Sequence, residues 1–126
     1  MENFTINGKL FIPSVNFNAE THLLEIGGES YHEFTKEFYQ PIMEWLKNYL
    51  AIPENTIVFN FKMNYYNTSS SRRFLEIFDM LEDYHTNKNG HVTVNWYYQA
   101  GDLDMLESGE EYAEDVGLPF NFFVMN

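Results

Sequence analysis

Cysteine is absent from this sequence of 126 residues, which excludes disulfide bonds, thiolate catalysis and zinc sites built on cysteine. Basic residues are scarce, because seven Lys and Arg stand against 19 Asp and Glu and the formal net charge is -12. A surface of this charge repels phosphate backbones and anionic lipids, so we expect neither nucleic acid nor a membrane as partner. A basic protein partner, or simple solubility, fits the charge better.

Long apolar runs and targeting signals are also missing. No apolar run approaches the length of a membrane-spanning helix. The segment from Met1 to Phe11 lacks both the basic start and the long apolar stretch of a signal peptide. We therefore expect a cytoplasmic protein.

The common signatures of metal and cofactor sites are absent as well. The four His show no metal-ligand spacing and no HExxH motif, and the acidic residues form no EF-hand pattern. Neither of the glycine-rich phosphate loops occurs, GxxxxGK followed by Ser or Thr, or GxGxxG. The sequence therefore predicts no metal, no cofactor and no catalytic residue.

Apolar residues, in contrast, are plentiful. Hydrophobic residues make up 44% of the chain and aromatic residues 18%, which is enough for a packed core. No repeat, linker or low-complexity tract divides the sequence. We therefore expect residues 1–126 to form one domain.

The apolar residues alternate in some segments and recur at helical spacing in others. The expected elements are, in order, strands at Lys9–Asn18 and His22–Ile26, a helix at Glu33–Leu50, a strand at Thr56–Tyr66, a helix with an apolar stripe from Phe74 to Tyr84, a strand at His91–Tyr98, an acidic helix at Leu103–Val116 and a strand at Phe120–Met125. The first two strands would form a hairpin closed by Gly27 and Gly28. Pro41 predicts a kink or two abutting helices.

This order of elements predicts an α/β fold with a single mixed sheet and helices packed on it. Right-handed crossovers would place the two helices with apolar stripes on one face of the sheet.

The run Asn67–Arg73 (NTSSSRR) lies between the clearest strand and the helix that follows it, so we expect it at a helix N-terminus. One of its residues would cap that helix, but a cap needs one hydroxyl and four are present: Thr68, Ser69, Ser70 and Ser71.

The only two arginines of the chain, Arg72 and Arg73, follow the hydroxyls directly. Cations in a first turn oppose the helix dipole, which makes sense if an anion sometimes occupies that turn. A bound phosphate and a phosphorylated hydroxyl both fit, and the missing glycine loop favours the second. An ordinary cap with solvent-facing arginines is the alternative.

Two further features have more than one interpretation. The acidic residues between Asp102 and Asp115 form either a solvated helix face or a docking surface for a basic partner. Ser69, Ser70 or Ser71 could be the nucleophile of a small enzyme, but no GxSxG elbow, base or orienting acid supports this.

Three segments of the chain resemble the SiaC family of bacterial regulatory phosphoproteins. They are GGESYHEFTKEFYQPIMEWLKNYL at Gly27–Leu50, FKMNYYNTSSSRR at Phe61–Arg73 and VNWYYQAGDLDMLESGEEYAED at Val94–Asp115. The segments stand in the order of the family and span most of the chain. The NTSSS run is the most specific of these likenesses.

The resemblance implies a fold akin to anti-sigma-factor antagonists (STAS-like domains) and a partner-switching role. It implies that Thr68 is phosphorylated by a cognate Ser/Thr protein kinase and dephosphorylated by a PP2C-like phosphatase. The unphosphorylated form would bind and activate a diguanylate cyclase, raise cyclic di-GMP and promote aggregation or biofilm formation. Asn67, Ser69, Ser70, Ser71, Arg72 and Arg73 would surround the phosphosite and contact partners. An anti-sigma-factor antagonist with an anti-sigma-type partner and a transcriptional output is the alternative.

Overall fold

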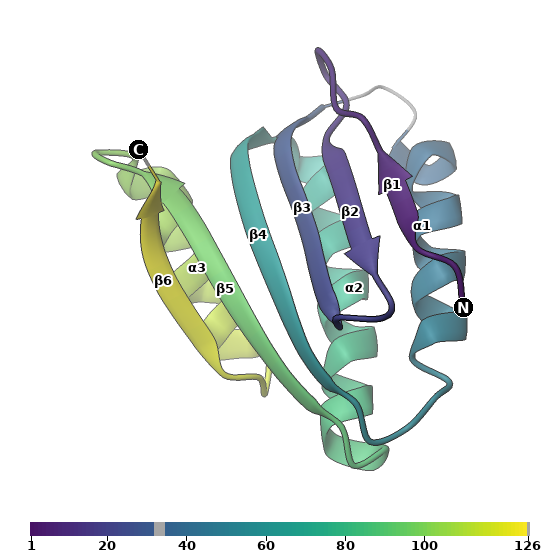
Figure 1. The fold of residues 1–126 in the computed structure, drawn as a ribbon. Coiled ribbons are helices and arrows are strands. Elements are labelled where there is room, and N and C mark those ends of the chain that lie inside the picture. The colour runs from purple at the N-terminus through teal and green to yellow at the C-terminus, as the bar shows by residue number, and fades with distance from the viewer. Residues whose placement is uncertain (32–34, 126) are drawn as a thin grey trace.

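Six strands form one mixed sheet in the computed structural model, which describes residues 1–31 and 35–125 (Figure 1). The strands are β1 (Phe4–Ile6), β2 (Ser14–Asn18), β3 (Leu23–Ser30), β4 (Thr56–Tyr66), β5 (His91–Gln99) and β6 (Phe120–Met125), and the helices are α1 (Thr35–Tyr49), α2 (Thr68–Asn87) and α3 (Leu103–Asp115). The strands lie side by side in chain order. The pairs β1–β2 and β2–β3 are antiparallel, and the pairs from β3 to β6 are parallel. The predicted α/β fold with a mixed sheet is confirmed.

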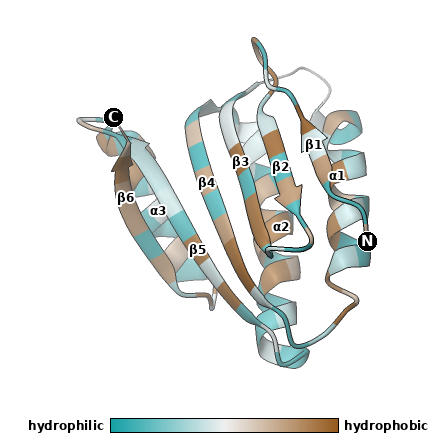
Figure 2. Ribbon diagram, in the orientation of Figure 1, coloured by the Kyte–Doolittle hydropathy of each residue, from teal (hydrophilic) through white to brown (hydrophobic). Residues whose placement is uncertain are grey.

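All three helices lie behind the sheet in Figure 1, and the near face of the sheet carries no helix. Each helix connects two neighbouring parallel strands, and crossovers of one hand put successive helices on the same face. Hydrophobic and polar residues alternate along the strands (Figure 2), so each strand turns its apolar side to the helices. The expected placement of the helices on one face is therefore confirmed.

The hairpin of β2 and β3 is confirmed, with Asn18 paired to Leu23, but its ends differ from the expectation. Gly27 and Gly28 do not close it, because they lie inside β3. Gly28 has a φ of 92°, and the register of β3 against β4 shifts directly after it. A glycine pair marks a bulge as readily as a turn, and here it marks the bulge.

The N-terminal strands also differ from the expectation. β1 is not predicted by the alternation pattern, since three residues are too few to show a period. The predicted strand at Lys9–Asn18 is shortened to Ser14–Asn18, because Lys9 and Ile12 form only an isolated bridge.

Pro41 lies inside one continuous helix, α1, so the expectation of two abutting helices is wrong. The expected start of this helix at Glu33 lies outside the described residues. Proline removes one backbone hydrogen bond, but Pro41 is exposed, and the opposite side of α1 is anchored by buried residues. These residues are Thr35, Tyr39, Ile42, Trp45, Leu46 and Tyr49. Packing of this stripe on the sheet offsets the lost bond.

Phe61 of β4 lies at the centre of the core and is fully buried. Its ring centroid lies 4.6 Å from that of Phe59 and 5.6 Å from that of Trp96. On the helix side, Phe74 and Phe78 of α2 lie 5.4 and 4.8 Å from it. The core therefore fixes the first turns of α2 against the middle of the sheet.

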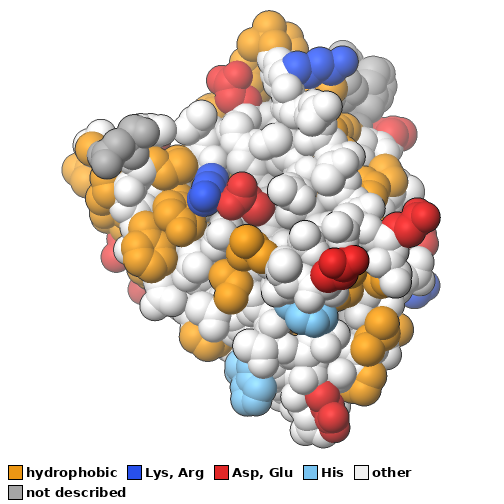
Figure 3. All heavy atoms as spheres, viewed as in Figure 1, with side chains coloured by type: hydrophobic (Ala, Val, Ile, Leu, Met, Phe, Trp, Pro, Cys, Tyr) orange, Lys and Arg blue, Asp and Glu red, His pale blue; other side chains and the backbone are white. Residues whose placement is uncertain are grey.

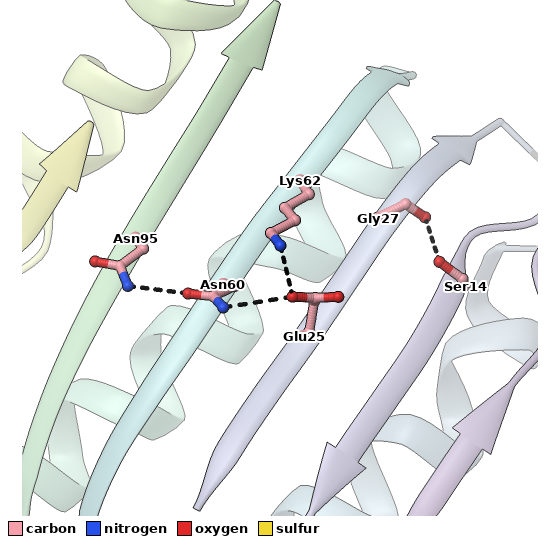
Figure 4. Close-up of polar contacts among 6 residues, drawn as sticks. All are labelled: Ser14, Glu25, Gly27, Asn60, Lys62 and Asn95. Atoms are coloured by element: carbon pink, nitrogen blue, oxygen red, sulfur yellow. Dashed lines mark hydrogen bonds and ion pairs between the residues drawn. The ribbon is translucent and has the colours of Figure 1, made fainter. Parts of the chain in front are cut away.

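The uncovered face of the sheet carries few charged side chains in Figure 3, and hydrophobic ones gather over β5 and β6. Across its middle runs a row of amides joined by hydrogen bonds (Figure 4). Asn121 donates to Asn95 at 3.2 Å, Asn95 to Asn60 at 3.0 Å, and Asn60 to Glu25 at 3.4 Å. Lys62 pairs with Glu25 at 3.0 Å. These five side chains thus satisfy part of one another's hydrogen-bonding capacity across the sheet.

Buried tyrosines predict a loss of stability at alkaline pH. Burial raises the pKa of Tyr49 to about 12 and holds the pKa of Tyr39 and Tyr66 well above the ordinary value of 10.0. Because unfolding releases these protons above pH 10.0, their stabilising contribution is complete below that pH and is lost as the pH rises through the folded pKa. We expect the thermal midpoint, followed by circular dichroism, to fall steeply between about pH 10 and 12. Tyr39→Phe should flatten the fall, whereas Tyr65→Phe, at a half-exposed side chain, should leave it unchanged; equal slopes would contradict the assignment to buried tyrosines.

Candidate functional site at the start of helix α2

The hydroxyl run lies where the sequence predicts it, at the start of α2. Asn67 has extended backbone angles, φ -89° and ψ 175°, and its side-chain oxygen accepts a hydrogen bond from the backbone N–H of Ser70 at 2.8 Å. Thr68 is the first residue of the helix. The expected cap is therefore Asn67, so none of the four hydroxyls is needed for capping.

Ser70 is fully buried and ties α2 to β3 and α1. Its hydroxyl donates to the backbone oxygen of Ser30 at 2.8 Å and lies 2.8 Å from the Ser30 hydroxyl. The Ser30 hydroxyl in turn lies 2.7 Å from the hydroxyl of Tyr39. Ser69 bonds to the hydroxyl of Thr35, the first residue of α1. These two serines have structural roles.

Ser71 contacts α3 on the other side of the helix. Its hydroxyl lies 2.6 Å from the hydroxyl of Tyr112, which also donates to the backbone oxygen of Ser71 at 3.1 Å. Tyr112 belongs to the last turn of α3, so the C-terminal end of α3 meets the N-terminal end of α2 here.

Thr68 differs from the three serines. It is exposed, and its hydroxyl forms no hydrogen bond with any residue of the described part of the chain. It stands in the wall of a cavity of about 300 Å³, together with residues from the end of β4, the start of α2 and α3. The lining residues are Tyr66, Asn67, Thr68, Ser71, Ser108, Glu111, Tyr112 and Asp115. Ser69 is exposed as well, so Thr68 differs from it in forming no such hydrogen bond among the described residues.

The two arginines are not in the wall of this cavity. Arg73 is mostly buried and pairs with Glu76 at 3.0 Å, one turn further along α2. Arg72 is exposed and follows Thr68 by four residues, which places both side chains on the same side of the helix. The structure therefore brings Asn67, Thr68 and Ser71 together at the cavity. Arg72 does not line the cavity, and Arg73 pairs with Glu76 instead.

The α3 side of the cavity is the part that the sequence reasoning missed. Ser108, Glu111, Tyr112 and Asp115 recur at a spacing of three and four residues, which is the spacing of one helix face. That spacing shows that the four residues share one face of a helix, but it does not show which other element this face contacts. Burial raises the pKa of Tyr112 and of Tyr66, so both phenols keep their protons at neutral pH, and Tyr112 donates its proton to the backbone oxygen of Ser71.

The hydrogen-bond partners of the three serines bear on the alternative of a serine nucleophile. Within residues 1–31 and 35–125, Ser69, Ser70 and Ser71 have other hydroxyls and backbone atoms as partners, and no His, Asp or Glu bonds to them. The same part of the chain holds no group of three or more His, Asp or Glu that could bind a metal. None of its helices has the length and apolar character needed to cross a bilayer.

Comparisons with known proteins agree with the family resemblance. The model of the SiaC family of regulatory phosphoproteins matches residues 6–125. A protein of Pseudomonas aeruginosa (strain UCBPP-PA14), described as uncharacterized, is 28% identical over 120 residues, which are 95% of this chain and 94% of that protein.

Solved structures of SiaC extend the likeness to the whole fold. The crystal structure of apo-SiaC from P. aeruginosa aligns with a TM-score of 0.90 at 27% identity, over 98% of this chain and 100% of that chain. A chain in the crystal structure of the diguanylate cyclase SiaD in complex with its activator SiaC, from the same organism, aligns with a TM-score of 0.90 at 26% identity, over 97% and 99%. The expected likeness to STAS-like domains stays a prediction.

Proposed function

The chain belongs to the SiaC family of regulatory phosphoproteins, and on this premise we propose that it is a phosphorylation switch that binds and activates a diguanylate cyclase while Thr68 is unphosphorylated. The cyclase is the enzyme, and this chain regulates it as one cytoplasmic domain. A cognate Ser/Thr kinase adds the phosphate, and a PP2C-like phosphatase removes it. The output is the level of cyclic di-GMP and, through it, biofilm formation.

One observation carries the assignment to Thr68. Of the four consecutive hydroxyls, three bond to other parts of the chain, and Thr68 is exposed with no such bond among the described residues. A kinase needs a hydroxyl that it can surround, and phosphorylating Ser70 or Ser71 would break bonds that hold α2 in place. At the first position of a helix, a phosphate also meets free backbone N–H groups.

The alternative output is transcriptional, with an anti-sigma-type protein in place of the cyclase. The switch would be the same, and the partner would differ. The related complex, in which the diguanylate cyclase SiaD binds its activator SiaC, favours the cyclase. Capture of the cyclase rather than an anti-sigma-type protein by the unphosphorylated protein would support the first output.

The direct test is phosphorylation of the purified protein by its cognate kinase, followed by intact mass and phosphopeptide sequencing. We expect a single phosphate on Thr68, because it is the exposed and unbonded hydroxyl of the run. Thr68→Val should abolish the mass gain, and the matched control Ser69→Ala, at the neighbouring exposed hydroxyl, should retain it. A phosphate found only outside residues 68–71, or an unchanged gain in Thr68→Val, would overturn the assignment.

A further inference from the structure

The charges that face Thr68 come from α3. Glu111 and Asp115 line the cavity beside Thr68, and none of the described residues that line it is basic. α3 has no basic residue in its last turn, so its carbonyl end adds partial negative charge at the same place. Among the described residues, the salt bridges are Lys62 with Glu25 and Arg73 with Glu76, so neither cavity carboxylate is paired. A phosphate on Thr68 would therefore enter a site that already carries two carboxylates.

α3 is attached to the rest of the fold through few residues. Of its own residues only Met105 and Gly109 are buried. Gly109 sits directly on the indole of Trp96, where an added Cβ would come within 2.5 Å of the ring, and Trp96 donates to the backbone oxygen of Met105 at 2.9 Å. These contacts hold the first half of the helix. The second half is held by Tyr112, whose ring packs on Phe78 and Trp96 and whose hydroxyl group forms two hydrogen bonds with Ser71.

A phosphate on Thr68 cannot easily turn away from these carboxylates. The first turn of α2 offers free N–H groups and contains no acidic residue, so it holds the phosphate close to the helix end. That end is where Tyr112 binds Ser71. The phosphate carries a charge of about -1.5 to -2 at neutral pH. Attraction by α2 and repulsion by α3 thus act on the same group.

We propose that α3 changes its contact with α2 in response to phosphorylation of Thr68. Repulsion between the phosphate and the carboxylates of Glu111 and Asp115 opens the Ser71–Tyr112 contact and loosens the second half of α3 from the start of α2. This inference rests on the proposed phosphorylation of Thr68 and adds the structural change by which that phosphate affects the rest of the protein. The acidic surface of α3 is then presented to the partner in two different states, docked on α2 or loosened.

Hydrogen exchange tests the proposal on the full chain. Phosphothreonine is installed at position 68 during translation through a recoded stop codon, so that no kinase is needed. We expect the amides of residues 106–116 to exchange about tenfold faster in the phosphorylated protein, and those of α1 to be unchanged. In the variant Glu111→Gln/Asp115→Asn, which keeps side-chain shape and removes both charges, the increase should fall below about twofold.

The matched control is Glu110→Gln/Glu114→Gln. It removes the same charge from the same helix at exposed positions that do not line the cavity, and it should keep the full increase. Unchanged exchange on phosphorylation, or equal increases in the two double variants, would overturn the proposal. Either result would leave the proposed phosphorylation of Thr68 by a kinase intact, because here the phosphate is introduced during translation without a kinase. Conversely, a kinase that ignores Thr68 would defeat the proposed function without deciding how α3 responds.

Discussion

Phosphorylation of Thr68 is expected to weaken binding of the diguanylate cyclase by roughly 100-fold, which lies within the range of coupling free energies in known switches. The single charge of Thr68→Glu should weaken it by roughly tenfold, since it supplies less charge and fewer acceptors than a phosphate. Thr68→Val should bind like the unmodified protein and stay bound in the presence of the kinase. Titration calorimetry gives the affinities, and the rate of cyclic di-GMP synthesis reports activation.

Thr68→Gln separates charge from size, because Gln and Glu differ in charge but hardly in shape. We expect Thr68→Gln to bind within about threefold of the unmodified protein if charge decides the switch. Equal loss with Gln and Glu would instead mean that filling the cavity of about 300 Å³ blocks the partner. The sign of the effect is also informative. If the partner surface were purely basic, a phosphate on this acidic protein would strengthen its binding. Tighter binding on phosphorylation would therefore contradict the proposed switch.

The position of the site could be predicted from the sequence, but its surroundings could not. A hydroxyl run between a strand and a helix must lie at a helix N-terminus, and the asparagine before it is a natural cap. The partners of the hydroxyls come from Ser30, Thr35 and Tyr112, which are about 35–40 residues away in the sequence and give no local signal. Only the folded chain distinguishes Thr68 from the serines that follow it.

The directions of the two arginines could not be predicted from the sequence either. Their position next to the hydroxyls suggests a shared phosphate site. However, α2 begins at Thr68, so both arginines lie beyond the first turn where they were expected, and consecutive residues of a helix point about 100° apart. Arg73 pairs with Glu76, whereas Arg72 stays on the side of Thr68. The sequence also does not show which residues of the acidic segment belong to the site. Glu111 and Asp115 line the cavity, whereas their neighbours Glu110 and Glu114 do not.

In the fold, long periodic segments were predictable and local irregularities were not. The alternation of β4 extends over 11 residues and fixes both its type and its buried face. The glycine pair of β3 and the proline of α1 carry a local preference that tertiary packing overrides. The short β1 gains its stability from pairing with β2, which no local pattern encodes.

Phe61→Ala is expected to lower the free energy of unfolding by about 3–5 kcal/mol, the usual cost of removing a buried phenyl ring. Phe61 is fully buried between the rings of Phe59 and Trp96 in the sheet and those of Phe74 and Phe78 on α2. These neighbours are fixed by the backbone of two packed layers, so they cannot collapse into the space that the ring leaves. Urea unfolding, with the midpoint and slope both fitted, measures the loss.

Phe123→Ala is the matched control, because it makes the same truncation on β6 at a side chain that is 43% exposed. It should cost much less than Phe61→Ala, about 1 kcal/mol, because 43% of Phe123 stays exposed in the folded protein and its truncation removes less buried area. Comparable losses in the two variants would contradict the placement of Phe61 at the centre of the core. The surviving folded fraction of Phe61→Ala should still be phosphorylated on Thr68, because the Asn67 cap and the Ser30–Ser70 bonds hold the start of α2 independently of that ring.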